Sequence, residues 1–416
     1  MKIQGQIDLP GDKSISHRAL MIASLSTKTS TIKNLASGKD VESTGDCLKK
    51  CNISISGNTN IEKIITGYTF QDPKSELDCG NSGTTIRLLS GLLASRNIKA
   101  TLIGDESLSK RPMGRIIRPL LKMNLSINAK NNKTPINIEK SDIKSIDYHS
   151  DISSAQVKSA VLFAGLGATN KTTYQEPFLS RDHTEIMLKS VGANIEIYDN
   201  KISIKNMSQP LFPLNMRVPA DPSTAAFFAG AVSILPQSEI TLKNLLTNPT
   251  RFEFFNVIKL MGVDVDVLSK NFEGGESVSD ISIKNKRLKS ISIEKSKIPS
   301  LIDEIPILAI IATQAEGKTI IRGAEELRVK ESDRIESIIF NLRNMGAIVE
   351  EFNDGFSIEG PTKLNGTGIR TFGDHRIAMA FTIAGLVADG ETKLDNYKCI
   401  DISFPEFFAT LKDIIK

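Results

Sequence analysis

Apolar residues recur in long runs along this chain, and each run opens on small, polar or charged residues. Six such segments begin near Asp12, Asn81, Ser153, Asp221, Asp303 and Gly373. By subtraction, their starting points lie 69, 72, 68, 82 and 70 residues apart. A long and nearly fixed period is typical of a repeated supersecondary unit. Because the runs are rich in Ala, Gly, Leu and Ile, they predict a set of buried helices.

A second helix is predicted after the first in several repeats, over residues 111–123, 182–191, 252–261 and 331–345. Three of these helices end on a glycine that suits a left-handed C-cap, namely Gly192, Gly262 and Gly346. Alternating segments follow at 194–198 and 263–267, with partner strands at 201–204, 282–284 and 355–358. Such alternation predicts sheets with one buried face.

The repeat is therefore a β-α-β-α-β-β unit of about 70 residues, which is small for independent stability. Three units that pack their helices together would bury them, so six units predict two domains. We assign residues 1–11 and 221–416 to domain I and residues 12–220 to domain II. The first strand, 1–9, is placed with the C-terminal half because the chain ends on a helix, 404–411, without a complete following unit. Two crossings near Gly11 and Ala220 then predict a hinge.

Composition narrows the class of protein. The chain has 416 residues, of which 40% are hydrophobic and 24% charged, as in ordinary globular proteins. The 52 basic and 48 acidic residues give a net charge of +4, and no dense Lys/Arg run occurs, so no nucleic acid is expected as a partner. Local basic clusters are compatible with small anionic ligands.

The four cysteines and four histidines show no metal-binding spacing, so we expect no metal. Reduced thiols, and an N-terminus without an apolar signal segment, predict a cytoplasmic protein. The apolar runs 225–235 and 305–312 are shorter than the roughly 20 residues that a bilayer requires. We therefore expect no membrane association.

The first turns of the predicted helices carry polar and charged side chains. The groups are Lys13, Ser14 and Arg18; Asn81, Gly83, Thr84 and Arg87; Ser153, Ser154 and Gln156; Asp303; and His375 and Arg376. Free N–H groups and the helix dipole make such starts anion sites. Ser, Asn and Asp also occur there simply as caps. Capping does not explain why cations lie at a helix start, because a positive charge there opposes the helix dipole. We therefore predict that these helix starts bind anions.

Two basic clusters strengthen this prediction. Residues 110–115 read KRPMGR and residues 328–334 read RVKESDR, each just before or within a helix start. Arginine is suited to bidentate capture of phosphate or carboxylate. A P-loop is the rival interpretation for Gly11–Ser14, but Asp12 separates the glycine from the lysine, and the required upstream glycine spacing is absent.

These motifs together resemble those of the 5-enolpyruvylshikimate-3-phosphate synthase family, also called 3-phosphoshikimate 1-carboxyvinyltransferase. The matching segments are LPGDKSISHRAL, CGNSGTTIRLL, KRPMGR, SAQVKSAVLFAG, LRVKESDRI and GDHRIAMAF, which span residues 9 to 382. The resemblance implies an inside-out α/β barrel fold, with six βαβαββ units in two domains that close on substrates. It implies transfer of the enolpyruvyl group of phosphoenolpyruvate to the 5-hydroxyl of shikimate 3-phosphate, without a metal or organic cofactor. The family is also the target of glyphosate.

The resemblance also implies which residues bind each substrate. Shikimate 3-phosphate would be held by Lys13, Ser14, Arg18, Ser153, Ser154, Gln156, Ser180, Asp303 and Lys330. Phosphoenolpyruvate would be held by Lys13, Asn81, Gly83, Thr84, Arg87, Arg111, Gln156, Arg334, His375 and Arg376. Both substrates are polyanions, which gives the basic clusters a purpose.

The implied reaction needs a base at the ring hydroxyl and an acid at the enolpyruvyl methylene. Asp303 and Glu331 match the family's acid–base pair, and Lys13 is a further proton-transfer candidate. An acid that protonates carbon requires a raised pKa or delivery of its proton in a closed site. Without the surrounding motifs, Asp303 would be interpreted as a helix cap and Glu331 as a partner of a helix dipole.

Two positions depart from the family pattern. Ile402 stands where some relatives carry a lysine before the Ser-Phe-Pro segment, and Ala155 interrupts the Ser-Ser-Gln seen in others.

Two alternative functions fit parts of the pattern. One is a UDP-N-acetylglucosamine enolpyruvyl transferase, but the loop before Arg111-Pro112 has no cysteine, and Lys13 precedes Ser14 rather than asparagine. The other is a non-catalytic repeat protein that binds phosphorylated ligands, which the paired carboxylates argue against. A monomer is expected.

Overall fold

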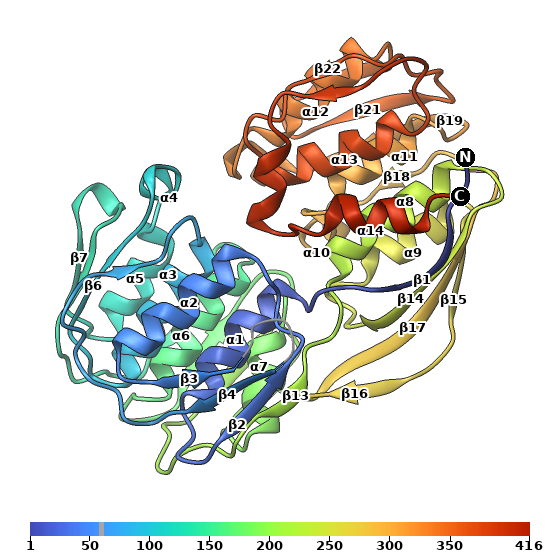
Figure 1. Cartoon of the computed structure of the whole chain (residues 1–416). Helices are drawn as coiled ribbons and strands as arrows, with labels where there is room; N and C mark the ends of the chain where they lie inside the picture. The colour runs from blue at the N-terminus through green and yellow to red at the C-terminus, as the bar shows by residue number, and fades with distance from the viewer. Residues whose placement is uncertain (58–61) are drawn as a thin grey trace. The chain divides into compact units, whose positions relative to one another are not determined.

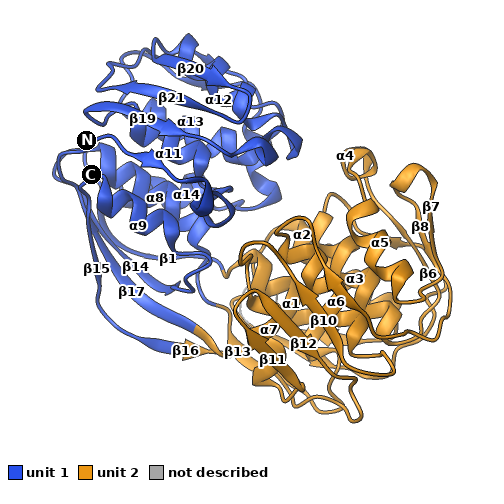
Figure 2. Ribbon diagram, turned by 180° about the vertical axis from the view of Figure 1, so that it is seen from behind, with its two compact units in different colours: residues 1–10, 219–271, 277–416 blue, residues 11–218, 272–276 orange. Residues whose placement is uncertain are grey.

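A computed structural model describes residues 1–57 and 62–416 of the chain. The chain divides into two compact units (Figure 2). Unit 1 contains Met1–Pro10, Pro219–Asn271 and Ser277–Lys416, and unit 2 contains Gly11–Val218 and Phe272–Glu276. The short segment 272–276 groups with unit 2, whereas the division drawn from the sequence places it in domain I.

Unit 2 contains three copies of the repeat. The first helices of the copies are α1 (Lys13–Ala23), α3 (Gly83–Ser95) and α6 (Ala155–Gly165). The second helices are α2 (Lys39–Lys50), α5 (Gly114–Lys122) and α7 (His183–Ser190), and a short α4 (Glu106–Lys110) precedes α5. The apolar runs predicted from the sequence are therefore helices in all three copies.

Each copy in unit 2 has its own four-stranded sheet. The strand orders are β13-β2-β4-β3, β5-β6-β8-β7 and β11-β12-β10-β9. The bounds are β2 (Ser30–Lys33), β3 (Ser54–Ser56), β4 (Glu62–Thr66), β5 (Leu77–Asp78), β6 (Ala100–Ile103), β7 (Ile127–Ala129), β8 (Ile136–Ile138), β9 (Asp147–His149), β10 (Thr172–Gln175), β11 (Ile195–Tyr198), β12 (Lys201–Ile204) and β13 (Asn215–Arg217). One parallel pair and an antiparallel hairpin recur in each sheet, as the βαβαββ unit requires.

Unit 1 repeats this plan. Its helices are α8 (Pro222–Ile234), α9 (Glu253–Leu260), α10 (Ile298–Leu301), α11 (Ile305–Ala312), α12 (Arg334–Asn344), α13 (His375–Gly385) and α14 (Phe407–Ile414). Its strands are β1 (Gln4–Asp8), β14 (Glu239–Leu246), β15 (Asp264–Val267), β17 (Glu276–Lys284), β18 (Ser292–Ile293), β19 (Gly317–Ile321), β20 (Ile348–Phe352), β21 (Gly355–Gly360), β22 (Gly368–Ile369) and β23 (Lys393–Leu394). The first residue of β17 belongs to the 272–276 segment, and β16 (Asn271–Glu273) begins at the last unit 1 residue before that segment and continues into it.

The two ends of the chain complete unit 1. Strand β1 pairs in parallel with β14 (Figure 1), so the N-terminal strand belongs to a sheet of the C-terminal half. The sixth copy is shorter than the others, because its described strands are only the parallel pair β22 and β23. Helix α14 follows this pair and ends near the last residue.

Capping residues account for several of the helix starts and ends. Asp12, Ser82, Ser154, Asp221 and Asp374 each accept a hydrogen bond from a backbone N–H of the helix that they precede. Gly192, Gly262 and Gly346 have φ values of 87°, 112° and 89°. Those left-handed angles are the predicted C-caps, and they favour glycine over residues with a side chain.

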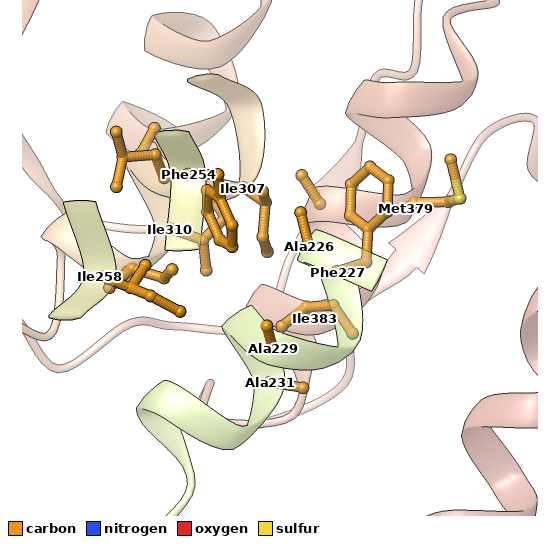
Figure 3. Packing of buried hydrophobic residues seen from close by; sticks show 14 of the residues in the cluster. Ala226, Phe227, Ala229, Ala231, Phe254, Ile258, Ile307, Ile310, Met379 and Ile383 are labelled. Carbon is orange, nitrogen blue, oxygen red and sulfur yellow. The ribbon is translucent and has the colours of Figure 1, made fainter. Parts of the chain in front are cut away.

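The apolar first helices contribute much of the core of unit 1, together with residues of the other helices and of the strands. Figure 3 shows Phe227 of α8, Ile307 of α11 and Ile383 of α13 packed together, and all three are buried. A helix that is apolar on every side must be covered on every side. No helix in the described ranges is both long enough and apolar enough to cross a bilayer.

In unit 2, small residues bring α3 and α6 into close contact. A Cβ built on Gly91 of α3 would lie 2.1 Å from the backbone oxygen of Ala160 in α6. A backbone oxygen cannot rotate away as a side chain can, so the two helices would have to separate.

We predict that Gly91→Ala lowers the free energy of unfolding by about 2 kcal/mol or more, because overpacking outweighs the gain in helix propensity. Gly45→Ala in α2 is the matched control, since its Cβ would meet only Leu20 Cδ1 at 4.0 Å. The control should gain up to about 1 kcal/mol. Urea unfolding of both variants checks the pair, and equal effects would contradict the close contact.

A buried polar chain links the first three helices of unit 2. His17 Nδ1 lies 2.7 Å from Thr44 Oγ1, and the Thr44 and Thr85 hydroxyls are also 2.7 Å apart. Thr85 Oγ1 in turn donates to Ser82 Oγ, the cap of α3, at 2.8 Å. Burial lowers the pKa of His17 to about 3, so its ring is neutral near pH 7.

This shift predicts a pH-dependent stability. In the unfolded chain His17 is protonated as the pH falls below about 6.5, whereas in the folded chain it stays neutral down to about 3. The unfolded state binds more protons in that window, so stability falls as the pH falls. Between pH 7 and pH 5, the free energy of unfolding should fall by about 2 kcal/mol more in the wild type than in His17→Gln.

Urea unfolding at both pH values measures the His17 effect. The exposed His149, changed to glutamine, is the control and should keep the wild-type pH dependence. Parallel pH profiles for wild type and His17→Gln would refute the prediction.

Candidate functional site

Arginine side chains gather at the start of α3 in unit 2. A Cβ on Gly83 would lie 2.9 Å from Arg87 Nη1 and 3.4 Å from Arg111 Nη1, so both guanidinium groups lie close to this glycine. Arg111 Nη2 donates to Asn81 Oδ1 at 2.7 Å, and Asn81 Nδ2 donates to Asp105 at 2.8 Å. Two cations and a helix start thus share one small region, which suits an anion.

Gln156 connects this region to the start of α6. Its amide nitrogen donates to Thr84 Oγ1 at 3.0 Å, and its amide oxygen accepts from Arg87 Nη1 at 2.5 Å. Thr84, Arg87 and Gln156 are all predicted to hold phosphoenolpyruvate, and the structure brings their side chains together. The position of Gln156 one residue beyond Ala155 does not prevent this contact.

The start of α1 contributes two further cations. Lys13 Nζ lies 3.1 Å from Asp40 Oδ2. Arg18 is buried, and it donates to Thr184 Oγ1, the Ser14 carbonyl and Ser159 Oγ at 2.7, 2.9 and 2.8 Å. Burial lowers the pKa of Arg18 to about 10, so the guanidinium remains charged at neutral pH.

Arg181 is a site candidate that sequence reasoning missed. Its Nη1 donates to Ser14 Oγ at 3.2 Å, and its side chain is half-buried. It directly follows Ser180 and precedes α7, so it occupies the same place relative to a helix as the two basic clusters. That position was the available signal for it.

Three of the four predicted serines, Ser153, Ser154 and Ser180, differ in what their hydroxyl groups do. Ser154 Oγ caps α6 by accepting from Val157 N at 3.4 Å. Ser153 Oγ donates to the Phe178 carbonyl at 2.7 Å, and Ser180 Oγ lies 2.8 Å from both carboxylate oxygens of Glu176. The hydroxyl groups of Ser153 and Ser180 already donate their protons to protein oxygens in this conformation. Toward a ligand, these two hydroxyl groups therefore present oxygen lone pairs rather than protons.

In unit 1, Arg334 is the centre of a cluster of carboxylates. It is 1% exposed and lies 2.8 Å from Asp374, 2.6 Å from Glu331 and 3.4 Å from Asp303. Burial alone would lower its pKa, but the surrounding carboxylates raise the pKa above that of a free arginine. A permanent cation is thus fixed between the two predicted acid–base residues.

Arg376 holds Asp303 from the other side. Its Nη1 donates to the Asp303 carbonyl at 3.0 Å, and its Nη2 lies 3.7 Å from Asp303 Oδ2. The cap position of α11 is occupied by Glu304 rather than Asp303. Asp303 instead contacts Arg334 of α12 and Arg376 of α13. Asp303 is therefore not the N-cap of α11.

Asp374 is a second residue that the site assignment omitted. It caps α13 by accepting from Arg376 N at 2.9 Å, and it binds the Arg334 guanidinium. Burial would raise its pKa, but Arg334 outweighs this effect and the pKa of Asp374 lies below its ordinary value. Of the other predicted residues in unit 1, His375 is buried and Lys330 is half-buried after the 3₁₀ helix Glu325–Val329.

The start of α8 at Asp221 has a structural explanation. Asp221 Oδ1 accepts from Ser223 N at 2.8 Å and from Arg251 Nη2 at 2.9 Å. Arg251 also donates to Ser223 Oγ, and Ser223 binds Glu304. This start is therefore capped and tied to neighbouring elements of unit 1.

No group of three or more His, Cys, Asp or Glu residues in the described part of the chain is arranged to hold a metal ion.

Comparison with known proteins identifies the family. A model of the family described as EPSP synthase (3-phosphoshikimate 1-carboxyvinyltransferase) matches residues 1–411. The 3-phosphoshikimate 1-carboxyvinyltransferase of Thermodesulfovibrio yellowstonii is 46% identical over 420 residues, covering 100% of this chain and 98% of that protein. The protein of the same name from Desulforamulus reducens is 45% identical, covering 100% of this chain and 97% of that protein.

A solved structure of EPSP synthase from Acinetobacter baumannii has a TM-score of 0.90 to this chain at 38% sequence identity. The alignment covers 99% of this chain and 96% of that one. The predicted α/β fold class and the predicted family are thus confirmed. The chain belongs to the EPSP synthase (3-phosphoshikimate 1-carboxyvinyltransferase) family.

Proposed function

We propose that this chain transfers the enolpyruvyl group of phosphoenolpyruvate to the 5-hydroxyl of shikimate 3-phosphate. The products are inorganic phosphate and 5-enolpyruvylshikimate 3-phosphate. The observation that supports this proposal best is the cluster in unit 1, where buried Arg334 lies against Asp303 and Glu331. A charged arginine beside two carboxylates offers both an anion-binding group and proton-transfer groups.

Unit 2 supplies the polyanion-binding side chains. We assign Ser14, Arg18, Ser154 and Gln156 to shikimate 3-phosphate, and we add Arg181 because it contacts Ser14. Ser153 and Ser180 of unit 2, and Lys330 of unit 1, are assigned to the same substrate. Phosphoenolpyruvate is assigned to Lys13, Asn81, Gly83, Thr84, Arg87 and Arg111 of unit 2. Their guanidinium and ammonium groups match the phosphate and carboxylate of that substrate in charge and geometry.

Unit 1 supplies the acid–base chemistry. Arg334, His375 and Arg376 are assigned to phosphoenolpyruvate, and Asp303 and Glu331 to proton transfer, with Lys13 of unit 2 as a further candidate. The fixed cation of Arg334 suits the anionic form of the carboxylates that it touches. In the addition, an ionised carboxylate accepts the proton of the 5-hydroxyl, the hydroxyl oxygen bonds to C2 of phosphoenolpyruvate, and the methylene carbon takes up a proton as the C=C π bond breaks. In the elimination that follows, a proton leaves the methyl group, the C=C bond reforms and the C2–O bond to phosphate breaks, which releases inorganic phosphate.

The chain is further proposed to act in the cytoplasm as a monomer, and light scattering of the purified protein at micromolar concentration tests the latter. A mass of twice 45.5 kDa would contradict it.

Phosphate release from phosphoenolpyruvate tests the function directly. We expect release with shikimate 3-phosphate as acceptor, and none above background with UDP-N-acetylglucosamine or without an acceptor. Release with UDP-N-acetylglucosamine alone would favour the alternative enzyme. A folded protein that binds both substrates but releases no phosphate would favour a binding protein.

We predict that Glu331→Gln lowers kcat by roughly 10²- to 10⁴-fold, because the amide cannot transfer a proton. The melting temperature should change little, since Glu331 is exposed enough for water to solvate the amide. Glu336→Gln in the first turn of α12 is the matched control and should keep full activity. Normal turnover by Glu331→Gln would refute the acid–base assignment.

A further inference from the structure

Unit 2 contains a buried charged group that the proposed reaction does not use. Lys158 of α6 is 0% exposed, and Glu176 and Glu185 are each 1% exposed. Lys158 Nζ lies 2.8 Å from Glu176 Oε1 and 2.7 Å from Glu185 Oε1. Buried charges of this kind are costly unless they are paired, so a fold that keeps three of them needs a reason.

Glu176 joins two segments that carry proposed substrate-binding residues. Its Oε1 accepts from Ser180 N at 2.8 Å, and its Oε2 accepts from Ser154 N at 3.3 Å. Ser180 Oγ lies 2.8 Å from each of the two oxygens. A single carboxylate therefore ties the start of α6 to the loop that follows β10.

The same loop leads directly to Arg181, whose guanidinium reaches Ser14. Fixing Ser180 thus fixes the backbone from which Arg181 extends. Lys158 supports this loop a second time, because its Nζ also donates to the Ser180 carbonyl at 3.2 Å.

We propose that Glu176 is a positioning residue for shikimate 3-phosphate, acting through Ser154 and Ser180 and kept in place by Lys158. The proposal rests on the proposed function, in which Ser14, Arg18, Ser154 and Arg181 bind that substrate. Glu176 holds the cap of α6 and the loop before α7 at a fixed separation, so that their side chains meet the ligand without rearrangement.

The charges explain why a carboxylate is tolerated near an anionic ligand. An unpaired carboxylate would repel the substrate, but Lys158 lies against Glu176 and offsets part of its charge, since the same lysine also pairs with Glu185. Glu185 is the second partner of this lysine, and it also acts electrostatically on the buried Arg18. Glu176 and Glu185 therefore share one lysine, while Glu176 is the one that binds Ser154 and Ser180.

Glu176→Gln tests the positioning role. Glutamine keeps the shape of the side chain but replaces one carboxylate oxygen with an NH₂ group. The N–H or O–H groups that donated to that oxygen then face another donor and lose their hydrogen bonds. We expect KM for shikimate 3-phosphate to rise roughly ten-fold or more, because hydrogen bonds to a charged group are lost. kcat and KM for phosphoenolpyruvate should change by less than about three-fold, since the phosphoenolpyruvate residues are held by other contacts.

Glu185→Gln is the matched control. It removes a carboxylate from the same lysine and leaves the carboxylate that holds Ser154 and Ser180. We expect its KM for shikimate 3-phosphate to stay within about two-fold of wild type, even if both variants melt at a lower temperature. An equal rise of KM in both variants would indicate general loosening of unit 2 and would overturn the proposal. An unchanged or lower KM in Glu176→Gln would overturn it as well.

A binding measurement separates this proposal from the function on which it rests. Saturating shikimate 3-phosphate should raise the melting temperature of the wild-type protein, and less so at the same concentration for Glu176→Gln. If wild type shows neither this rise nor phosphate release, the proposed function fails and the positioning role fails with it. If wild type binds and Glu176→Gln binds equally well, only the positioning role is overturned.

Discussion

The burial of apolar helices on every side is the constraint on which the rest of the structure depends. Helices such as α8 and α11 are buried along almost their whole length, so they pack mainly against other apolar groups. Their starts are the places where free N–H groups need acceptors and where polar side chains can lie. In each unit, the residues that can bind ligands or transfer protons are therefore found at helix starts. The strands that precede the helices fix the positions of these starts.

Cations at these starts would destabilise the helices if they were not offset. Lys13 is offset by Asp40, and Arg334 by Asp374, Glu331 and Asp303. Arg18 differs, because the hydrogen bonds of its guanidinium go to neutral oxygens and its pKa is lowered by burial. A cation held in this way retains more of its attraction for an incoming anion than one already paired with a carboxylate. This difference agrees with a substrate-binding role for Arg18.

The sequence predicted what depends on neighbours along the chain and missed what depends on packing. The helices and the glycine C-caps follow from local pattern, and the structure has them. Arg181 contacts Ser14 across 167 residues, and Lys158 meets Glu176 and Glu185 from different elements. No spacing rule connects such pairs, because their proximity is set by how the helices of unit 2 pack. The direction of the Ser153 and Ser180 hydroxyls depends on the same packing.

Each unit fixes its own helix starts through a few shared polar groups. In unit 1, Asp374 caps α13 and binds Arg334, which in turn contacts Asp303 before α11 and Glu331 before α12. In unit 2, Gln156 joins the starts of α3 and α6, and Glu176 joins the start of α6 to the loop before α7. Groups held in this way need little reorganisation when charge develops beside them, which is the main source of electrostatic stabilisation in enzymes. Because Asp374 and Glu176 are themselves buried and charged, their cost in folding stability is the counterpart of an ordered site.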